Sequence, residues 1–146
     1  MQFTTLNQVI NKLEEIQQSH AQLNGFGFGE DFELSTQQEN YPLMWVNVLS
    51  SSITDKTLSL GIGVLILDIV SDDNSNEKDI LSDTLSICQD VYSMLMNPNN
   101  TDEFELSNTV TLNPLFEAFP DKVNGWRMDL TIELPYEKNR CFIPLK

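Results

Sequence analysis

Residues that perform acid–base, nucleophilic or metal chemistry are scarce in this sequence, apart from carboxylates. It contains one histidine, His20, and two cysteines, Cys88 and Cys141, beside 22 Asp and Glu. These do not match a zinc site, whose Cys and His ligands come in closely spaced pairs. The Gly-x-Ser-x-Gly, Walker and His-Glu-x-x-His motifs are also absent. We therefore expect no catalytic set, no metal site and no cofactor; an acid–base hydrolase built on paired carboxylates stays as an alternative.

The glycine-rich stretch Gly25-Phe26-Gly27-Phe28-Gly29 invites comparison with a phosphate-binding loop. Such a loop follows a strand, opens a helix and is accompanied by a lysine, and none of these surrounds the stretch. Glu30 and Asp31, directly after it, would repel a phosphate. The sequence predicts a turn that leads into a strand.

A polar link later in the chain has calcium-loop spacing. Asp72, Asn74 and Asn76 occupy positions one, three and five of an EF-hand, and Asp83 falls at position twelve. Position six is Glu77, however, where the sharp turn requires glycine, and Asp83 is too short for the usual bidentate glutamate. We expect a polar link instead, in which Asn76 caps the helix that follows.

The chain is strongly acidic, with 8 Lys and Arg against 22 Asp and Glu and a net charge of −14. This charge argues against free-standing binding to nucleic acid or to an anionic membrane. It leaves two interpretations open: an acidic surface that maintains solubility, or copies that meet basic end to acidic flank. The second rests on five basic residues in the last quarter of the chain: Lys122, Arg127, Lys138, Arg140 and Lys146.

Apolar periodicity and turn signals predict a helix, a short strand, a hairpin, a second helix, a second hairpin and a tail. The expected ranges are 6–23 for the first helix, 43–49 and 57–70 for the first hairpin around a polar loop at 50–56, 77–95 for the second helix, and 104–112 with 128–134 for the second hairpin.

Four local signals refine this order. Thr5 and Gln8 fit a capping box at the start of the first helix, and Asn24-Gly25 fits its end. His20 continues the apolar stripe of this helix and is expected at the edge of the core with its hydrogen bonds satisfied. Gly61 and Gly63 share one face of a strand, which predicts a bulge or the close approach of another backbone.

These elements predict an α+β fold. We expect a two-layer domain over residues 1–135, in which an antiparallel sheet carries both helices on its apolar face. The opposite face would keep a row of Glu, Asp and Thr. Residues 136–146, bracketed by Pro135 and Pro144, are expected to form an extended C-terminal tail. No apolar run of about 18 residues and no secretory signal is present, so we expect a soluble intracellular protein.

Several strings of the sequence resemble small structural proteins of tailed phages that infect Bacteroidota, crAss-like phages among them. They are scattered in order over nearly the whole chain, and the expected element order is also similar to that of phage tail-terminator and neck proteins. The strings are Phe26-Gly27-Phe28-Gly29-Glu30, Asn40-Tyr41-Pro42-Leu43-Met44-Trp45-Val46, Leu67-Asp68-Ile69-Val70, Asn76-Glu77 with Ile80-Leu81-Ser82-Asp83-Thr84-Leu85, Gly125-Trp126 and Asn139-Arg140-Cys141.

This resemblance implies a virion protein without a cofactor or a reaction. It would be made in the host cytoplasm and form a ring at the head–tail junction, as a neck or tail-terminator subunit. The ring would join the portal or connector to the tail, and genomic DNA would pass through its lumen as cargo. A non-enzymatic bacterial adaptor remains an alternative, as does the hydrolase.

A closed ring needs a heterologous contact, in which one surface of a subunit meets a different surface of the next. Three regions are candidates: the loop at 50–56 with Asp55 and Lys56, the sheet face, and the tail. On the alternative interpretation the tail is a last edge strand of its own subunit. The candidate residues of the sheet face are Glu105, Asp129 and Glu133, and those of the tail are Lys138, Arg140, Phe142, Ile143 and Leu145.

Overall fold

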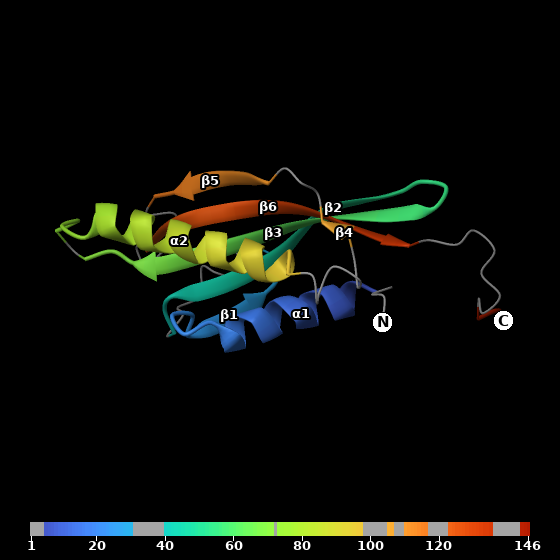
Figure 1. Ribbon diagram of the computed structural model, residues 1–146, viewed down its shortest axis with the longest axis horizontal. Helices are drawn as coiled ribbons and strands as arrows, with labels where there is room; N and C mark the ends of the chain where they lie inside the picture. Colours follow the sequence, from blue (N-terminus) through green and yellow to red (C-terminus); the bar gives the residue numbers. More distant parts are fainter. Residues whose placement is uncertain are drawn as a thin grey trace.

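The computed structural model describes residues 5–30, 40–71, 73–97, 105–106, 110–116, 123–135 and 144–146. These residues form two helices and a six-stranded sheet, so the α+β class is confirmed (Figure 1). The elements are α1 Leu6–Ser19, β1 Gly25–Phe28, β2 Leu43–Ile53, β3 Thr57–Ile69, α2 Glu77–Leu95, β4 Glu105–Leu106, β5 Thr111–Leu115 and β6 Val123–Pro135.

The predicted capping box begins α1. The Thr5 hydroxyl accepts a hydrogen bond from the Gln8 amide at 3.3 Å, and the Gln8 side chain accepts one from the Thr5 amide at 3.1 Å. The helix ends at Ser19, earlier than predicted, because His20 takes an extended backbone conformation. The His20 Nδ1 accepts from the Gln22 amide at 3.1 Å, and its Nε2 lies 2.9 Å from the Asp90 carboxylate on α2. His20 thus has the satisfied hydrogen bonds that its position predicted.

The sheet has the order β1-β2-β3-β6, with β4 and β5 both paired to the far side of β6. Every pair is antiparallel except β1–β2, which is parallel. The prediction of a wholly antiparallel sheet is therefore wrong at this pair. Residues 29–42 separate the two strands, and a connection of a dozen or more residues lets the chain return to the starting end, as parallel pairing requires.

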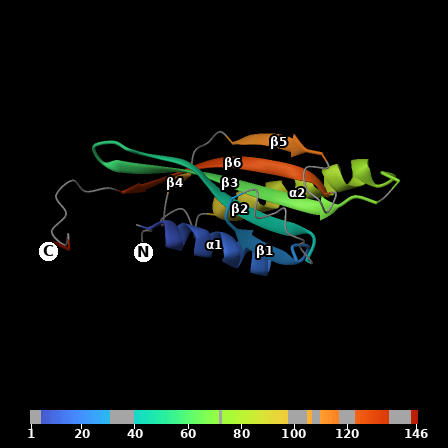
Figure 2. The same ribbon diagram turned by 180° about the vertical axis from the view of Figure 1, so that it is seen from behind.

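One face of the sheet carries both helices. Both helices lie on the same side of the sheet in Figures 1 and 2. Alternate side chains of β3 and β6 pack there, as strand geometry requires, against the apolar stripes of α1 and α2. Trp126 also ties α2 to the sheet, since its indole nitrogen donates to the Leu81 carbonyl at 2.9 Å. The buried core residues are Val9, Leu13 and Ile16 of α1, Leu23 between α1 and β1, Met44 and Val46 of β2, Leu60, Ile62, Val64 and Ile66 of β3, Ile87, Cys88, Val91 and Leu95 of α2, and Met128, Leu130, Ile132 and Leu134 of β6.

The opposite face is not uniformly polar, contrary to the prediction. At its β1 end it buries a second apolar cluster, made of Leu43, Trp45, Leu65, Leu67 and Val123. The polar residues, among them Ser52, Ser59 and Glu133, share the other end of this face because the strand register places them side by side.

Trp45 explains the spacing of the glycines in β1. Gly27 pairs with Trp45, and a Cβ at Gly27 would overlap the indole ring. The ring therefore occupies the space that a side chain at Gly27 would take, and its nitrogen donates to the Gly29 carbonyl at 3.2 Å. The stretch Gly25–Phe28 is itself a strand that accommodates a tryptophan, where the sequence predicted a turn leading into a strand.

The β2–β3 hairpin is longer than predicted. Its strands continue through most of the expected polar loop, and only Thr54–Lys56 form the turn. The register shifts between Val48 and Ser50, next to Gly61, where an added Cβ would lie 3.2 Å from the Ser50 carbonyl oxygen. The predicted bulge is confirmed. The hairpin extends past the ends of both helices along the long axis of the molecule (Figures 1 and 2).

Candidate interaction surface

The residues predicted to form a subunit interface are only partly brought together. Asp55 and Lys56 occupy the exposed turn of the hairpin. Thr57 of β3 pairs with Pro135, the last residue of β6, so the tail leaves the sheet beside this turn. Leu145 is 86% exposed. The remaining tail candidates, Lys138, Arg140, Phe142 and Ile143, lie outside the described residues.

The acidic sheet face is smaller than predicted. Glu105 and Glu133 face each other across β4 and β6 and are exposed. Asp129, in contrast, is engaged by Arg127 through two contacts, Nε to Oδ1 at 2.8 Å and Nη2 to Oδ2 at 3.2 Å. The Nη2 contact is a hydrogen bond and the Nε contact is a close approach of opposite charges, and this ion pair neutralises both side chains. Asp129 is therefore not a free acidic contact, because the two-residue period of the strand places Arg127 beside it.

An open strand edge, which sequence reasoning missed, lies on β2. Strand β1 pairs with β2 only over Leu43–Val46. On the side away from β3, Val48–Ile53 has no partner strand within the described part of the chain. All six side chains are exposed, with Val48 at 37%, Leu49 at 43% and Ile53 at 61%. The length of β3 could have revealed this edge. A strand of that length needs a neighbour of similar length, so β2 had to extend beyond the part that the short strand β1 covers.

The chemistry of this edge is unusual for an exposed strand. The six residues Val48-Leu49-Ser50-Ser51-Ser52-Ile53 include neither a charge nor a proline. Natural proteins generally protect exposed edges with charged residues, prolines or bulges. Of these three devices, Val48–Ile53 has only the bulge at Val48–Ser50, so the outer part of the edge carries no residue that discourages pairing.

The opposite edge of the sheet is protected. There β5 contains Pro114, paired with Trp126 of β6. Proline has no amide hydrogen and is tolerated in a sheet where its nitrogen faces away from the neighbouring strand. The outward side of β5 therefore lacks a donor at Pro114, and the two edges are chemically different.

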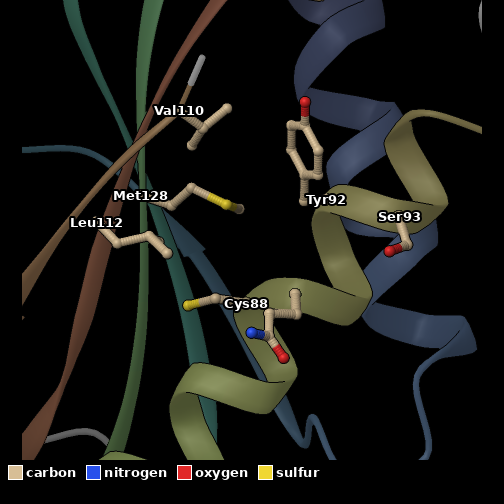
Figure 3. Close-up of a pocket in the computed structure, with 7 residues that line it drawn as sticks. Cys88, Tyr92, Ser93, Val110, Leu112 and Met128 are labelled. Atoms are coloured by element: carbon tan, nitrogen blue, oxygen red, sulfur yellow. The ribbon is translucent and has the colours of Figure 1, made fainter. Parts of the chain in front are cut away.

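An apolar pocket of about 350 Å³ lies between α2 and the β5–β6 side of the sheet. Figure 3 shows Cys88 and Tyr92 of α2 facing Val110, Leu112 and Met128 across it. Burial raises the pKa of the Cys88 thiol to about 12. The thiol is therefore protonated at neutral pH and is not a nucleophile. The lining includes no carboxylate or imidazole, so the pocket gives no support to a hydrolase.

The polar groups of the link with calcium-loop spacing form hydrogen bonds with one another, within residues 71–76. Asp73 accepts hydrogen bonds from the Ser75 amide at 3.0 Å and the Ser71 hydroxyl at 2.9 Å, and these bonds lower its pKa to about 2. The prediction that the Asn76 side chain caps α2 is wrong. Its Oδ1 instead accepts a hydrogen bond from the Ser71 amide at 2.7 Å. Asp72 lies outside the described residues, and the described ones contain no cluster of three metal-ligating side chains.

Comparison with known proteins identifies no relative: no family model and no curated protein matches this chain. Within the described ranges, neither helix has the length and hydropathy needed to cross a membrane. What this surface binds is therefore inferred from the exposure, charge and strand pairing of its residues.

Proposed function

We propose that this chain is a ring-forming structural subunit at the head–tail junction of a tailed phage. It joins the connector to the tail as a neck or tail-terminator protein. The observation that carries this proposal is the open, uncharged edge of β2, which lies at the same end of the sheet as the exit of the tail. An exposed strand edge is a template for pairing with another chain. The sequence resemblance to phage structural proteins points in the same direction.

The distribution of charge fits a contact between copies. Subunits with a net charge of −14 repel one another, so a contact between them is favoured where charge is absent or opposite in sign. The β2 edge carries no charge, and three of the eight basic residues lie in the tail. An edge on one subunit and a tail on the next are different surfaces, as a ring requires.

The same charge suits a lumen that DNA crosses. Tight binding to DNA comes mainly from Lys and Arg that neutralise phosphates. A wall poor in these residues leaves the genome free to move, so DNA is a passing cargo. The lasting partners are other copies of the chain, the portal or connector, and tail proteins.

The mass of the purified full chain in solution tests the ring. We expect light scattering after size-exclusion chromatography to show a closed oligomer, and negative-stain images to show particles with a central opening. A monomer at every concentration contradicts the proposal. A monomer or dimer that binds one other protein would favour the adaptor.

Removal of residues 139–146 tests the part played by the tail. We expect the truncated subunit to keep the circular dichroism spectrum of the full chain and to lose the oligomer. A truncated chain that unfolds would show that the tail belongs to its own sheet. A truncated chain that still assembles would show that the ring does not need the tail.

A further inference from the structure

We propose that the open edge of β2, Val48–Ile53, receives the C-terminal tail (residues 136–146) of a neighbouring copy as an added β-strand. This inference rests on the proposed ring and names the contact that would close it. It assigns one receiving edge and one donated strand to every subunit, a heterologous contact that repeats from copy to copy.

The backbone of the edge is suited to strand addition. The Thr54 amide donates to the Thr57 carbonyl at 2.8 Å, so this pair is hydrogen-bonded within the hairpin. Inward and outward amides alternate along an antiparallel strand. The amides and carbonyls of Ile53 and Ser51 therefore point away from β3, toward the open side. The six-residue edge is about 20 Å long, a normal length for a paired strand.

The tail begins at the correct end of the molecule. Pro135 pairs with Thr57, next to the hairpin turn, and the C-terminus lies at the same end of the long axis (Figures 1 and 2). Eleven residues follow Pro135 and span up to about 35 Å when extended. The side chain of Leu145 is 86% exposed, so the end of the tail is not packed against its own subunit.

The subunit's own edge is a poorer target than that of a neighbour. Strands β3 and β2 separate the end of β6 from the open side of β2. The tail of the same subunit would have to cross the hairpin turn and reverse its direction before it could pair. The tail of an adjacent copy approaches the edge from outside the sheet and needs no such reversal.

Charge favours the same pairing. The tail contains Lys138, Arg140 and Lys146 against one acidic residue, Glu137. The hairpin end of the sheet exposes the opposite sign, with Asp55, Glu105 and Glu133 against Lys56. The edge of β2 is itself neutral, so pairing there does not bury a charge. Asp55 lies at the end of this edge, whereas Glu133 and Glu105 lie on β6 and β4, on the other side of β3. The protected edge at β5 offers no equivalent site.

A disulfide test distinguishes the possible occupants of the edge, because the tail contains a native thiol, Cys141, whereas Cys88 is buried. Ser52→Cys is the variant of choice. Its amide faces β3, so it would occupy a non-hydrogen-bonded position beside an added strand, where side chains approach most closely. The full-length variant also carries Cys141→Ser, is mixed with the wild-type chain and is oxidised mildly. Ser50→Cys lies two residues along β2 on the same face, and it would be the position to bridge if the added strand were shifted by two residues.

The matched control introduces a cysteine on the protected edge instead, as Thr111→Cys on β5, again together with Cys141→Ser. We expect a disulfide-linked pair of chains on a non-reducing gel from Ser52→Cys or Ser50→Cys, at least tenfold more abundant than from Thr111→Cys. Peptide mapping should place the bridge at Cys141 of the wild-type chain.

Three results would overturn the inference. A second variant, Ser52→Cys with the native Cys141 kept, tests the alternative within one chain, since a bridge inside that single chain would mean that the tail pairs with its own edge. A bridge between two substituted β2 strands would mean that β2 pairs with β2. An oligomer of the expected mass without any bridge would remove this contact but leave the ring, whereas a monomeric mass without a bridge would remove both.

Discussion

Among the glycines of the described strands, Gly125 of β6 leaves the least room for a side chain. A Cβ built on it would overlap the carbonyl oxygen of Ile66 on β3, a backbone atom that cannot turn aside as a side chain can. The glycine thus allows β3 and β6 to approach where the second apolar cluster is buried.

We expect Gly125→Ala to lower the free energy of unfolding by about 3 kcal/mol, since the two strands must move apart in a packed region. Gly61→Ala is the control, because its added methyl group would lie 3.2 Å from the Ser50 carbonyl oxygen, at a bulge that can adjust. We expect it to cost less than about 1 kcal/mol. Urea denaturation of both variants measures the difference, and equal losses would contradict the role given to Gly125.

At the scale of elements, the end of β3 meets the first half of α2 at a partly buried carboxylate. Asp68 lies on the helix side of β3, and burial raises its pKa. The Ile69 amide, which donates to Asp68 Oδ1 at 2.8 Å, acts in the opposite direction, and nearby Asp83 adds to the increase. A raised pKa means that the folded state disfavours the ionised form, so this group removes stability as pH rises through its pKa.

Asp68→Asn should therefore stabilise the protein at pH 7, by less than about 1 kcal/mol because the site is partly solvated. Near pH 3, below the ordinary pKa of the carboxyl group, the advantage should vanish. The control is Asp79→Asn, in the first turn of α2, where loss of a favourable charge at the helix terminus should lower stability at pH 7. Urea midpoints at the two pH values test both signs; a gain that persists at pH 3 would exclude the electrostatic explanation.

The edge of β2 gives a second prediction at this scale. Ser51→Pro removes an outward amide while keeping the hydrogen bonds between β2 and β3, a substitution that edge strands tolerate. If a strand adds here, the loss of one hydrogen bond, close to 1 kcal/mol, should weaken assembly about fivefold. Ser51→Thr keeps the donor and should assemble like the wild type. Sedimentation over a concentration series compares them, and unchanged assembly of Ser51→Pro would mean that the edge stays open in the oligomer.

At the scale of the whole molecule, net charge governs the response to DNA. With −14 on 146 residues and Arg127 already paired with Asp129, few cations remain to contact phosphates. We expect no shift of duplex DNA in a gel at 100 mM salt with about 10 μM protein. Submicromolar binding that weakens steeply with salt would contradict this expectation.

Local interactions made much of the fold predictable from the sequence alone. The Thr5–Gln8 capping box, the apolar stripes of both helices and the bulge near Gly61 depend on residues that are close in sequence or share a simple period. The acidic charge and the shortage of catalytic side chains also follow from composition. These features allowed the α+β class and the presence of a first hairpin to be anticipated.

Tertiary structure alone decided how distant segments meet. The parallel pairing of β1 with β2, the position of Trp45 on Gly27 and the pairing of Arg127 with Asp129 all depend on strand register. Local propensity does not specify register between segments that are far apart in sequence, because it results from side chains packing across strands. The open edge of β2 is a consequence of the same kind: β1 ends opposite Val46 while β3 continues, so Val48–Ile53 is paired on one side only.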